Sequence, residues 1–222
     1  SEYLRIEKRN SPHTVSGYCL DLNRFSNFIG YCNINSIKTS DIRDFLIFLR
    51  EKGLAETSVV RSLSSIKSFF KYLHIDNQLE FNPAEVIETP KCHRKLPNVL
   101  STRDIDKLLN SPDEKSLLGL RDKAMLEILY ATGLRVSELV KLKVSELDLE
   151  MGYLRTIGKG GKERIVPIGS LAKNAINQYI LNARYILLKG RKISEIFVTS
   201  RGKCMTRQGF WKLLKKYVVL AN

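Results

Sequence analysis

Apolar residues in the first eighty positions recur at spacings of three and four, which return to the same face of an α-helix. Three such series are present, formed by Val15, Tyr18, Leu22, Phe25 and Ile29, by Ile42, Phe45 and Leu49, and by Val59, Leu63, Ile66, Phe70 and Leu73. The pattern predicts three amphipathic helices that pack together as a small bundle.

The helical pattern breaks at residues 82–98, NPAEVIETPKCHRKLPN, where three prolines occur. Proline cannot continue a helix, so this segment is predicted to be an extended linker. We therefore expect a helical domain over residues 1–81 and a second domain over residues 99–222.

The second domain is predicted to begin with helices. Ser101 and Asp104 have the spacing of a capping box, which predicts a helix through Asn110. Residues 117–132 are apolar on most of the helix circumference, and such a helix is expected at the centre of its domain.

Alternation with a period of two follows in residues 147–169 and predicts short strands, with the glycine-rich GKGG at the tip of a hairpin. Further elements are expected as a helical stretch at about 170–188, a short strand at 195–200, and a helix capped by Thr206 that runs to about Leu220. The fold class is therefore mainly α, with two domains and a small antiparallel sheet in the second.

The net charge is the first indication of function. The 222 residues carry a formal charge of +14 and have a pI near 9.7. Residues 1–97 hold 14 Lys and Arg against 11 Asp and Glu, whereas residues 98–222 hold 23 against 12. A basic excess concentrated in one domain favours a polyanionic partner such as nucleic acid over a face that is basic only for solubility.

Other classes of protein are disfavoured by the same composition. No apolar run reaches the 18 or more residues of a membrane span, and the N-terminus lacks the apolar core of a signal peptide, so a cytoplasmic protein without a membrane partner is expected. The four cysteines are scattered and form no CxxC pair, which indicates neither a metal site nor a disulfide framework.

Residues 131–139, ATGLRVSEL, contain the strongest candidate for chemistry. Gly133 can end one helix in the left-handed conformation and VSEL can begin the next, which would place Arg135 at a helix N-terminus. A guanidinium group there suits a phosphate, and Glu138 could hold that group in position. The alternative is an Arg135–Glu138 pair that only caps a helix.

A second cluster of cations lies in the hairpin, where GKGGKER carries Lys159, Lys162 and Arg164. The segment is not a Walker A loop, because Thr156 replaces the first glycine and Glu163 follows Lys162 where Ser or Thr is required. A lysine at a glycine-rich tip could deliver a proton to a leaving alkoxide. The alternative is a surface hairpin with ordinary lysines.

DNA contacts are expected from Lys162 and Arg164 on the hairpin, and also from cations on two helices. On the third helix of the first domain, Arg61, Lys67 and Lys71 stand among serines, whose short side chains let a helix approach a phosphate backbone. On the last helix, Arg207 and Gln208 are candidates for base or phosphate contacts.

Together these segments resemble the tyrosine recombinases, and in particular the XerC/XerD chromosome-dimer resolvases. The segments that carry the resemblance are TSVVRSLSSIKSFFKYL, LPNVLST, LRDKAMLEILYATGLRVSELVKL, IGKGGKERIVPIG and MTRQGFWKLLKKY. The resemblance covers nearly the whole chain, and ATGLRVSEL followed by GKGxKER at this separation is its most specific part.

The resemblance implies a SAM-like core-binding domain and a catalytic domain that clamp duplex DNA, with four protomers, identical or of two related recombinases, on two sites. It implies that Arg135 is a catalytic residue that neutralises the scissile phosphate, and that Lys159 is the general acid for the 5′-hydroxyl. It also implies attack by a tyrosine to form a 3′-phosphotyrosyl link, without metal or other cofactor.

The sequence departs from the family at its end. The family continues with a His-x-x-Arg motif and a nucleophilic tyrosine, but no histidine follows His93 here and no tyrosine has the required context. Tyr217, on the last helix, is expected to be a packing residue. We therefore expect a C-terminally incomplete catalytic domain that binds DNA but does not cleave it alone.

Three alternatives remain at this point. The chain could come from a phage or integron integrase, or it could be a DNA-binding module that has lost its chemistry. An RNA-binding helical protein is the third, but the short predicted strands do not supply the exposed aromatic residues that such a protein would need.

Overall fold

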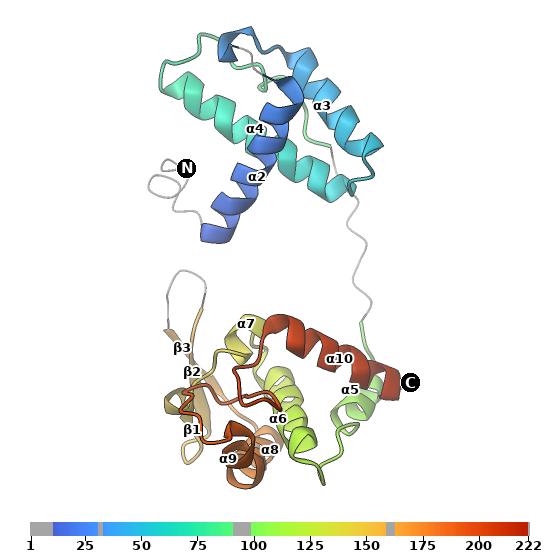
Figure 1. Ribbon diagram of the computed structural model, residues 1–222, viewed down its shortest axis with the longest axis vertical. Coiled ribbons are helices and arrows are strands. Elements are labelled where there is room, and N and C mark those ends of the chain that lie inside the picture. The colour runs from blue at the N-terminus through green and yellow to red at the C-terminus, as the bar shows by residue number, and fades with distance from the viewer. Residues whose placement is uncertain (1–10, 31–32, 91–98, 159–162, 222) are drawn as a thin grey trace. The chain divides into compact units, whose positions relative to one another are not determined.

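The computed structural model describes residues 11–30, 33–90, 99–158 and 163–221 (Figure 1). The chain divides into two compact units, Ser1–Pro97 and Asn98–Asn222. Each unit has its own hydrophobic core and is described separately.

The first unit is a bundle of helices. Its described elements are α2 (Pro12–Ile29), the short 3₁₀ helix η1 (Ile34–Ser36), α3 (Thr39–Glu51) and α4 (Glu56–Ile75). The predicted apolar faces of these three α-helices meet in a core where the ring of Phe25 makes edge contacts with Phe45 and Phe70. The three helices expected from the period of the apolar residues are therefore confirmed.

The segment after α4 also belongs to the first unit. Leu79, Ala84 and Ile87 are buried in the same core. The hydroxyl of Thr39 donates a hydrogen bond of 2.8 Å to the carbonyl oxygen of Pro83. The prediction that a linker starts at residue 82 is therefore wrong for residues 82–87, because their apolar side chains have a core to enter. Residues 91–98 lie outside the described part of the chain.

The second unit is mainly helical. Its helices are α5 (Thr102–Leu109), α6 (Leu117–Thr132), α7 (Val136–Leu139), the 3₁₀ helix η2 (Val144–Glu146), α8 (Ser170–Tyr179), the π-helical η3 (Ile180–Arg184), α9 (Tyr185–Leu188) and α10 (Arg207–Ala221). As expected, α6 lies at the centre, where it packs against α8 and also contacts α5, α7 and η3 (Figure 1).

Both predicted caps in this unit are confirmed. The Ser101 hydroxyl accepts a hydrogen bond from the backbone N–H of Asp104, and the Asp104 carboxylate accepts one from the backbone N–H of Ser101. At the start of α10, the hydroxyl of Thr206 accepts a hydrogen bond from the N–H of Gly209. These bonds satisfy N–H groups that have no partner within the helix.

The three-stranded sheet is antiparallel and has the order β1 (Leu147–Asp148), β2 (Tyr153–Ile157), β3 (Glu163–Pro167). In the β2–β3 hairpin, Leu154 pairs with Val166 and Thr156 pairs with Arg164. This hairpin was predicted from the alternating pattern. Its tip, residues 159–162, lies outside the described residues.

The prediction of a short strand at 195–200 is wrong. Only isolated bridges form there, between Lys143 and Glu195 and between Val198 and Cys204. Two side chains from the preceding helical stretch bind this backbone instead. The Tyr179 hydroxyl donates to the carbonyl of Ile196, and the Arg184 guanidinium donates to the carbonyls of Ile193, Glu195 and Ile196.

Candidate phosphate site and nucleic-acid interface

The chain turns sharply just before Arg135. Gly133 has φ 59° and ends α6, where its N–H donates to the carbonyl of Leu129 at 3.0 Å. This positive φ is readily adopted by glycine and strained for most other residues. Leu134 is buried and anchors the turn, so the backbone of Arg135 is held at the start of α7 while its side chain is 60% exposed.

Arg135 is bound to Glu138 by two contacts. Its Nη1 donates to Oε1 of Glu138 at 3.0 Å, and its backbone N–H donates to Oε2 at 2.7 Å. Because α7 spans only four residues, we expect the positive charge at this site to come from the guanidinium group more than from a helix dipole. The pairing of Arg135 with Glu138 was predicted from their spacing.

A second arginine binds the same carboxylate. Nη2 of Arg164, on β3, donates to Oε2 of Glu138 at 2.9 Å. The Glu138 side chain is 9% exposed, whereas that of Arg164 is 42% exposed. This contact joins the hairpin to α7, although Arg164 and Glu138 are 26 residues apart. We refer to Arg135, Glu138 and Arg164 as the arginine–glutamate cluster.

The cluster keeps Glu138 ionised. Burial alone would raise the pKa of this carboxyl, but the hydrogen bonds from Arg135 and the charges of Arg164 and Arg135 together hold its pKa below the usual range. Two positive charges and one negative charge then remain near pH 7. The cluster therefore has a net positive charge and an exposed guanidinium group, which suit a phosphate.

The two lysines of the predicted site, Lys159 and Lys162, lie outside the described residues. The strands that flank them are described, and β3 is joined to α7 by the Arg164–Glu138 contact. The hairpin and the Arg135 turn therefore lie next to each other, as the predicted site requires of these two elements.

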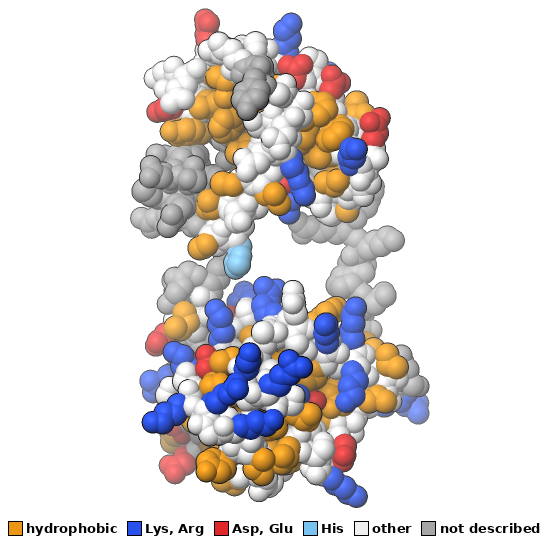
Figure 2. Space-filling model, viewed as in Figure 1, with side chains coloured by type: hydrophobic (Ala, Val, Ile, Leu, Met, Phe, Trp, Pro, Cys, Tyr) orange, Lys and Arg blue, Asp and Glu red, His pale blue; other side chains and the backbone are white. Residues whose placement is uncertain are grey.

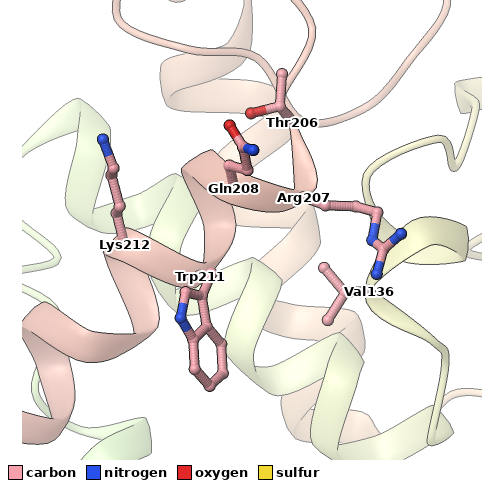
Figure 3. Close-up of a pocket in the computed structure, with 6 residues that line it drawn as sticks. All are labelled: Val136, Thr206, Arg207, Gln208, Trp211 and Lys212. Atoms are coloured by element: carbon pink, nitrogen blue, oxygen red, sulfur yellow. The ribbon is translucent and has the colours of Figure 1, made fainter. Parts of the chain in front are cut away.

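A groove of about 940 Å³ lies beside α7 at the start of α10. Its lining residues are Val136, Thr206, Arg207, Gln208, Trp211 and Lys212. Figure 3 shows Arg207 extending from α10 toward the side on which Val136 lies. The Nζ of Lys215 lies 5.5 Å from the centre of the Trp211 ring. A groove lined by two cations and one exposed aromatic ring suits a polyanion with stacked bases.

The two units differ in the charge that they expose. Figure 2 shows many Lys and Arg side chains over the visible face of the second unit, and a more even mixture of acidic and basic side chains on the first. This agrees with the uneven distribution of charge in the sequence. Arg207 lies on the more basic unit.

In the first unit, Arg61 has a partner within the protein. Its Nε and Nη2 each donate to the carboxylate of Asp21 at 2.9 Å, and the Ser65 hydroxyl donates to the same group at 3.2 Å. Asp21 is fully buried, while the Arg61 side chain is 47% exposed. Arg61 thus joins α4 to α2, and its expected contact with DNA is limited to the part of the guanidinium that faces water. Lys67 is half-buried and Lys71 is exposed.

We expect Arg61→Lys to lower the free energy of unfolding of the chain by about 1–2 kcal/mol, because an ammonium group cannot bind both oxygens of Asp21 in the same fork. Chemical denaturation measures this loss. Lys71→Ala on the same helix is the control and should change the free energy by less than about 0.5 kcal/mol. Equal effects of the two substitutions would contradict the assignment.

One buried polar network was not predicted. Arg121 and Asp122 on α6 form an ion pair at 2.6 Å, and the Tyr217 hydroxyl on α10 donates to Asp122 at 2.8 Å. Nη1 of Arg121 also donates to the carbonyl of Val198. The network fixes α10, which carries the groove residues, to the central helix. Tyr217 is buried, as expected of a packing residue, and the signal that was overlooked is a charged pair on an otherwise apolar helix.

No helix among the described residues is both long and apolar enough to cross a membrane. In the same ranges, no three residues of the types His, Cys, Asp and Glu are grouped so that they could hold a metal ion.

Comparisons with known proteins agree with these observations. A model of the phage integrase family matches residues 98–222, and a model of the phage integrase N-terminal SAM-like domain matches residues 1–76. Tyrosine recombinase XerD of Listeria innocua is 44% identical over 218 residues, which cover 96% of this chain and 73% of that protein. Tyrosine recombinase XerC of Herpetosiphon aurantiacus is 42% identical over 219 residues, covering 97% of this chain and 72% of the relative.

Solved structures show the same fold. A lambda integrase dimer bound to a COC′ core site matches with a TM-score of 0.73 at 15% identity, covering 97% of this chain and 77% of the other. The XerH recombinase bound to a palindromic difH substrate matches with a TM-score of 0.75 at 22% identity, covering 93% of this chain and 62% of the other. With two family models that together span nearly all of its length, and with Xer relatives above 40% identity, the chain belongs to the phage integrase family of tyrosine recombinases and is of the Xer type.

Proposed function

We propose that the 222 residues form the DNA-binding part and the phosphate-activating part of a Xer-type site-specific recombinase. This recombinase acts in the resolution of chromosome or plasmid dimers. The observation that carries this proposal is the arginine–glutamate cluster. It places an exposed guanidinium group beside the basic hairpin, in a chain of the tyrosine recombinase family.

The residues of the site have distinct roles in this proposal. The exposed Arg135 guanidinium binds a non-bridging oxygen of the scissile phosphate and neutralises the charge that develops there. Loss of one such donor typically costs about 2.7–4 kcal/mol of transition-state stabilisation. Glu138 holds Arg135 in place, and Lys159 donates the proton to the 5′-hydroxyl leaving group.

DNA binding in this proposal uses both units. In the first unit, α4 contacts the phosphate backbone of DNA through Arg61, Lys67 and Lys71. In the second unit, Lys162 and Arg207 contact DNA from the hairpin and from the groove beside α10. The structures of lambda integrase include a dimer bound to a core site and a tetramer bound to a Holliday junction. By analogy, we propose that four protomers assemble on two recombination sites.

The 222 residues are expected to bind duplex DNA without forming a covalent link to it, since they contain the phosphate site but no tyrosine in the family's catalytic context. Fluorescence anisotropy measures the affinity for a labelled duplex. A nicked suicide substrate, which traps a protein–DNA adduct, is then resolved on a denaturing gel.

The matching control for binding is an RNA duplex of the same sequence, which an RNA-binding protein would prefer. Tighter binding to RNA would contradict the proposal. A covalent adduct with the suicide substrate would show that a tyrosine within these residues is the nucleophile.

A further inference from the structure

We propose that Arg164 is a positioning residue for Arg135 that acts through Glu138, and that it is not primarily a contact to the DNA backbone. This inference rests on the proposed function, since it assigns to Arg135 the binding of a phosphate. It replaces the interpretation of Arg164 as a DNA-binding residue.

The first argument is the geometry of the shared carboxylate. Oε2 of Glu138 accepts hydrogen bonds from the backbone N–H of Arg135 and from Nη2 of Arg164, while Oε1 accepts one from the Arg135 guanidinium. Both oxygens are therefore engaged. Because the Glu138 side chain is 9% exposed, a rotation of its carboxylate would break contacts on both sides.

The second argument is the position of Arg164 in the sheet. Arg164 pairs in register with Thr156, which is buried, so its backbone is held against β2. Arg135 instead stands on a helix of four residues directly after a glycine turn. The Arg164–Glu138 contact therefore ties the carboxylate to the sheet as well as to α7, so that two elements fix the group that holds Arg135.

The third argument is the balance of charge. An Arg135–Glu138 pair alone has no net charge, and such a pair attracts a phosphate weakly. Arg164 offsets the charge of Glu138 and leaves one positive charge for the ligand. Arg164 therefore makes it possible for one carboxylate to orient Arg135 without cancelling its charge.

A test without DNA uses the side-chain ¹⁵N resonances of Arg135, assigned by their loss in Arg135→Lys. We expect Arg164→Ala to shift these resonances and Arg164→Lys to restore them in part. Arg155→Ala is the matched control, because Arg155 lies on the same hairpin and contacts Tyr153 rather than Glu138. It should leave the resonances unchanged. Unshifted resonances in Arg164→Ala, with circular dichroism that shows an intact fold, would overturn the proposal.

A test with DNA uses a double-mutant cycle measured by anisotropy on one labelled duplex. In the wild-type background we expect Arg164→Ala to weaken binding about threefold, the size typical of an exposed charge pair. In the Glu138→Gln background the same substitution should have almost no effect, since the carboxylate through which it acts is gone. An equal loss in both backgrounds, with a salt slope lower by about one unit in each, would identify a direct phosphate contact and refute the inference.

The two tests separate this inference from the proposed function. If the unmodified chain fails to bind duplex DNA, the proposed function is wrong, but the resonances of Arg135 still decide whether Arg164 positions it. If the chain binds DNA and the resonances do not respond, only the positioning role is wrong.

Discussion

Raising the salt concentration from about 50 to about 200 mM is expected to weaken duplex DNA binding by about a thousandfold, as for proteins that contact at least six phosphates. Each contact between a cation and a phosphate releases a counterion, so the logarithm of the binding constant falls linearly with the logarithm of the salt concentration. The chain has a net charge of +14, with most of the excess in its second unit. Anisotropy on one duplex over a series of salt concentrations measures the slope.

Single substitutions measure how much each cation contributes to this slope. Lys67→Ala and Lys162→Ala are each expected to lower it by about one unit, because each removes one phosphate contact. The control is Lys52→Ala, since the Lys52 ammonium lies 5.5 Å from the centre of the Phe48 ring on α3 and has no proposed contact with DNA. A binding constant that hardly changes with salt would contradict the proposed interface in both units.

Asp122→Ala is expected to lower the free energy of unfolding of the second unit by about 3–5 kcal/mol, as when one partner of a buried ion pair is removed. The Arg121 side chain is 8% exposed, and within the described ranges the substitution would leave its guanidinium with the carbonyl of Val198 as its one partner. The Tyr217 hydroxyl would lose its acceptor as well. Denaturation followed by circular dichroism measures the loss.

Two controls separate the effect of losing the ion pair from the effect of losing the Tyr217 hydrogen bond. Tyr217→Phe removes one hydrogen bond and keeps the ion pair, so a loss of about 1–1.5 kcal/mol is expected. Asp106→Ala, at an exposed aspartate on α5, should change stability by less than about 0.5 kcal/mol. If Asp122→Ala costs no more than Tyr217→Phe, the Arg121–Asp122 ion pair adds no stability beyond the hydrogen bond that joins α10 to α6.

Much of the fold could be predicted because the signals are local. The caps at Ser101 and Thr206 join groups three residues apart, and the apolar stripes of α2, α3 and α4 follow the helical period. The errors occur where contacts with residues distant in the sequence determine the local structure. The segment at 195–200 has the composition of a strand, but Tyr179 and Arg184 bind its backbone from a neighbouring helical stretch.

The candidate site shows the same division. The Arg135–Glu138 pair lies within one turn and follows from spacing. The contact from Arg164 depends on the register of the hairpin and on its packing beside α7, which no local pattern specifies.

The ion pair of Asp21 with Arg61 could have been predicted from the sequence. Asp21 lies three residues after Tyr18 and four before Phe25, on the stripe that faces the core. A carboxylate in that position requires a partner, and the partner is Arg61.

The segment that follows α4 has a practical consequence for dissecting the protein. Because Leu79, Ala84 and Ile87 lie in the core of the first unit, a fragment ending at residue 81 would lack Ala84 and Ile87 and leave apolar surface open to water. Such a fragment would tend to self-associate, and poor behaviour on its own would say little about its affinity for DNA. An excised N-terminal piece should therefore retain residues up to at least Thr89.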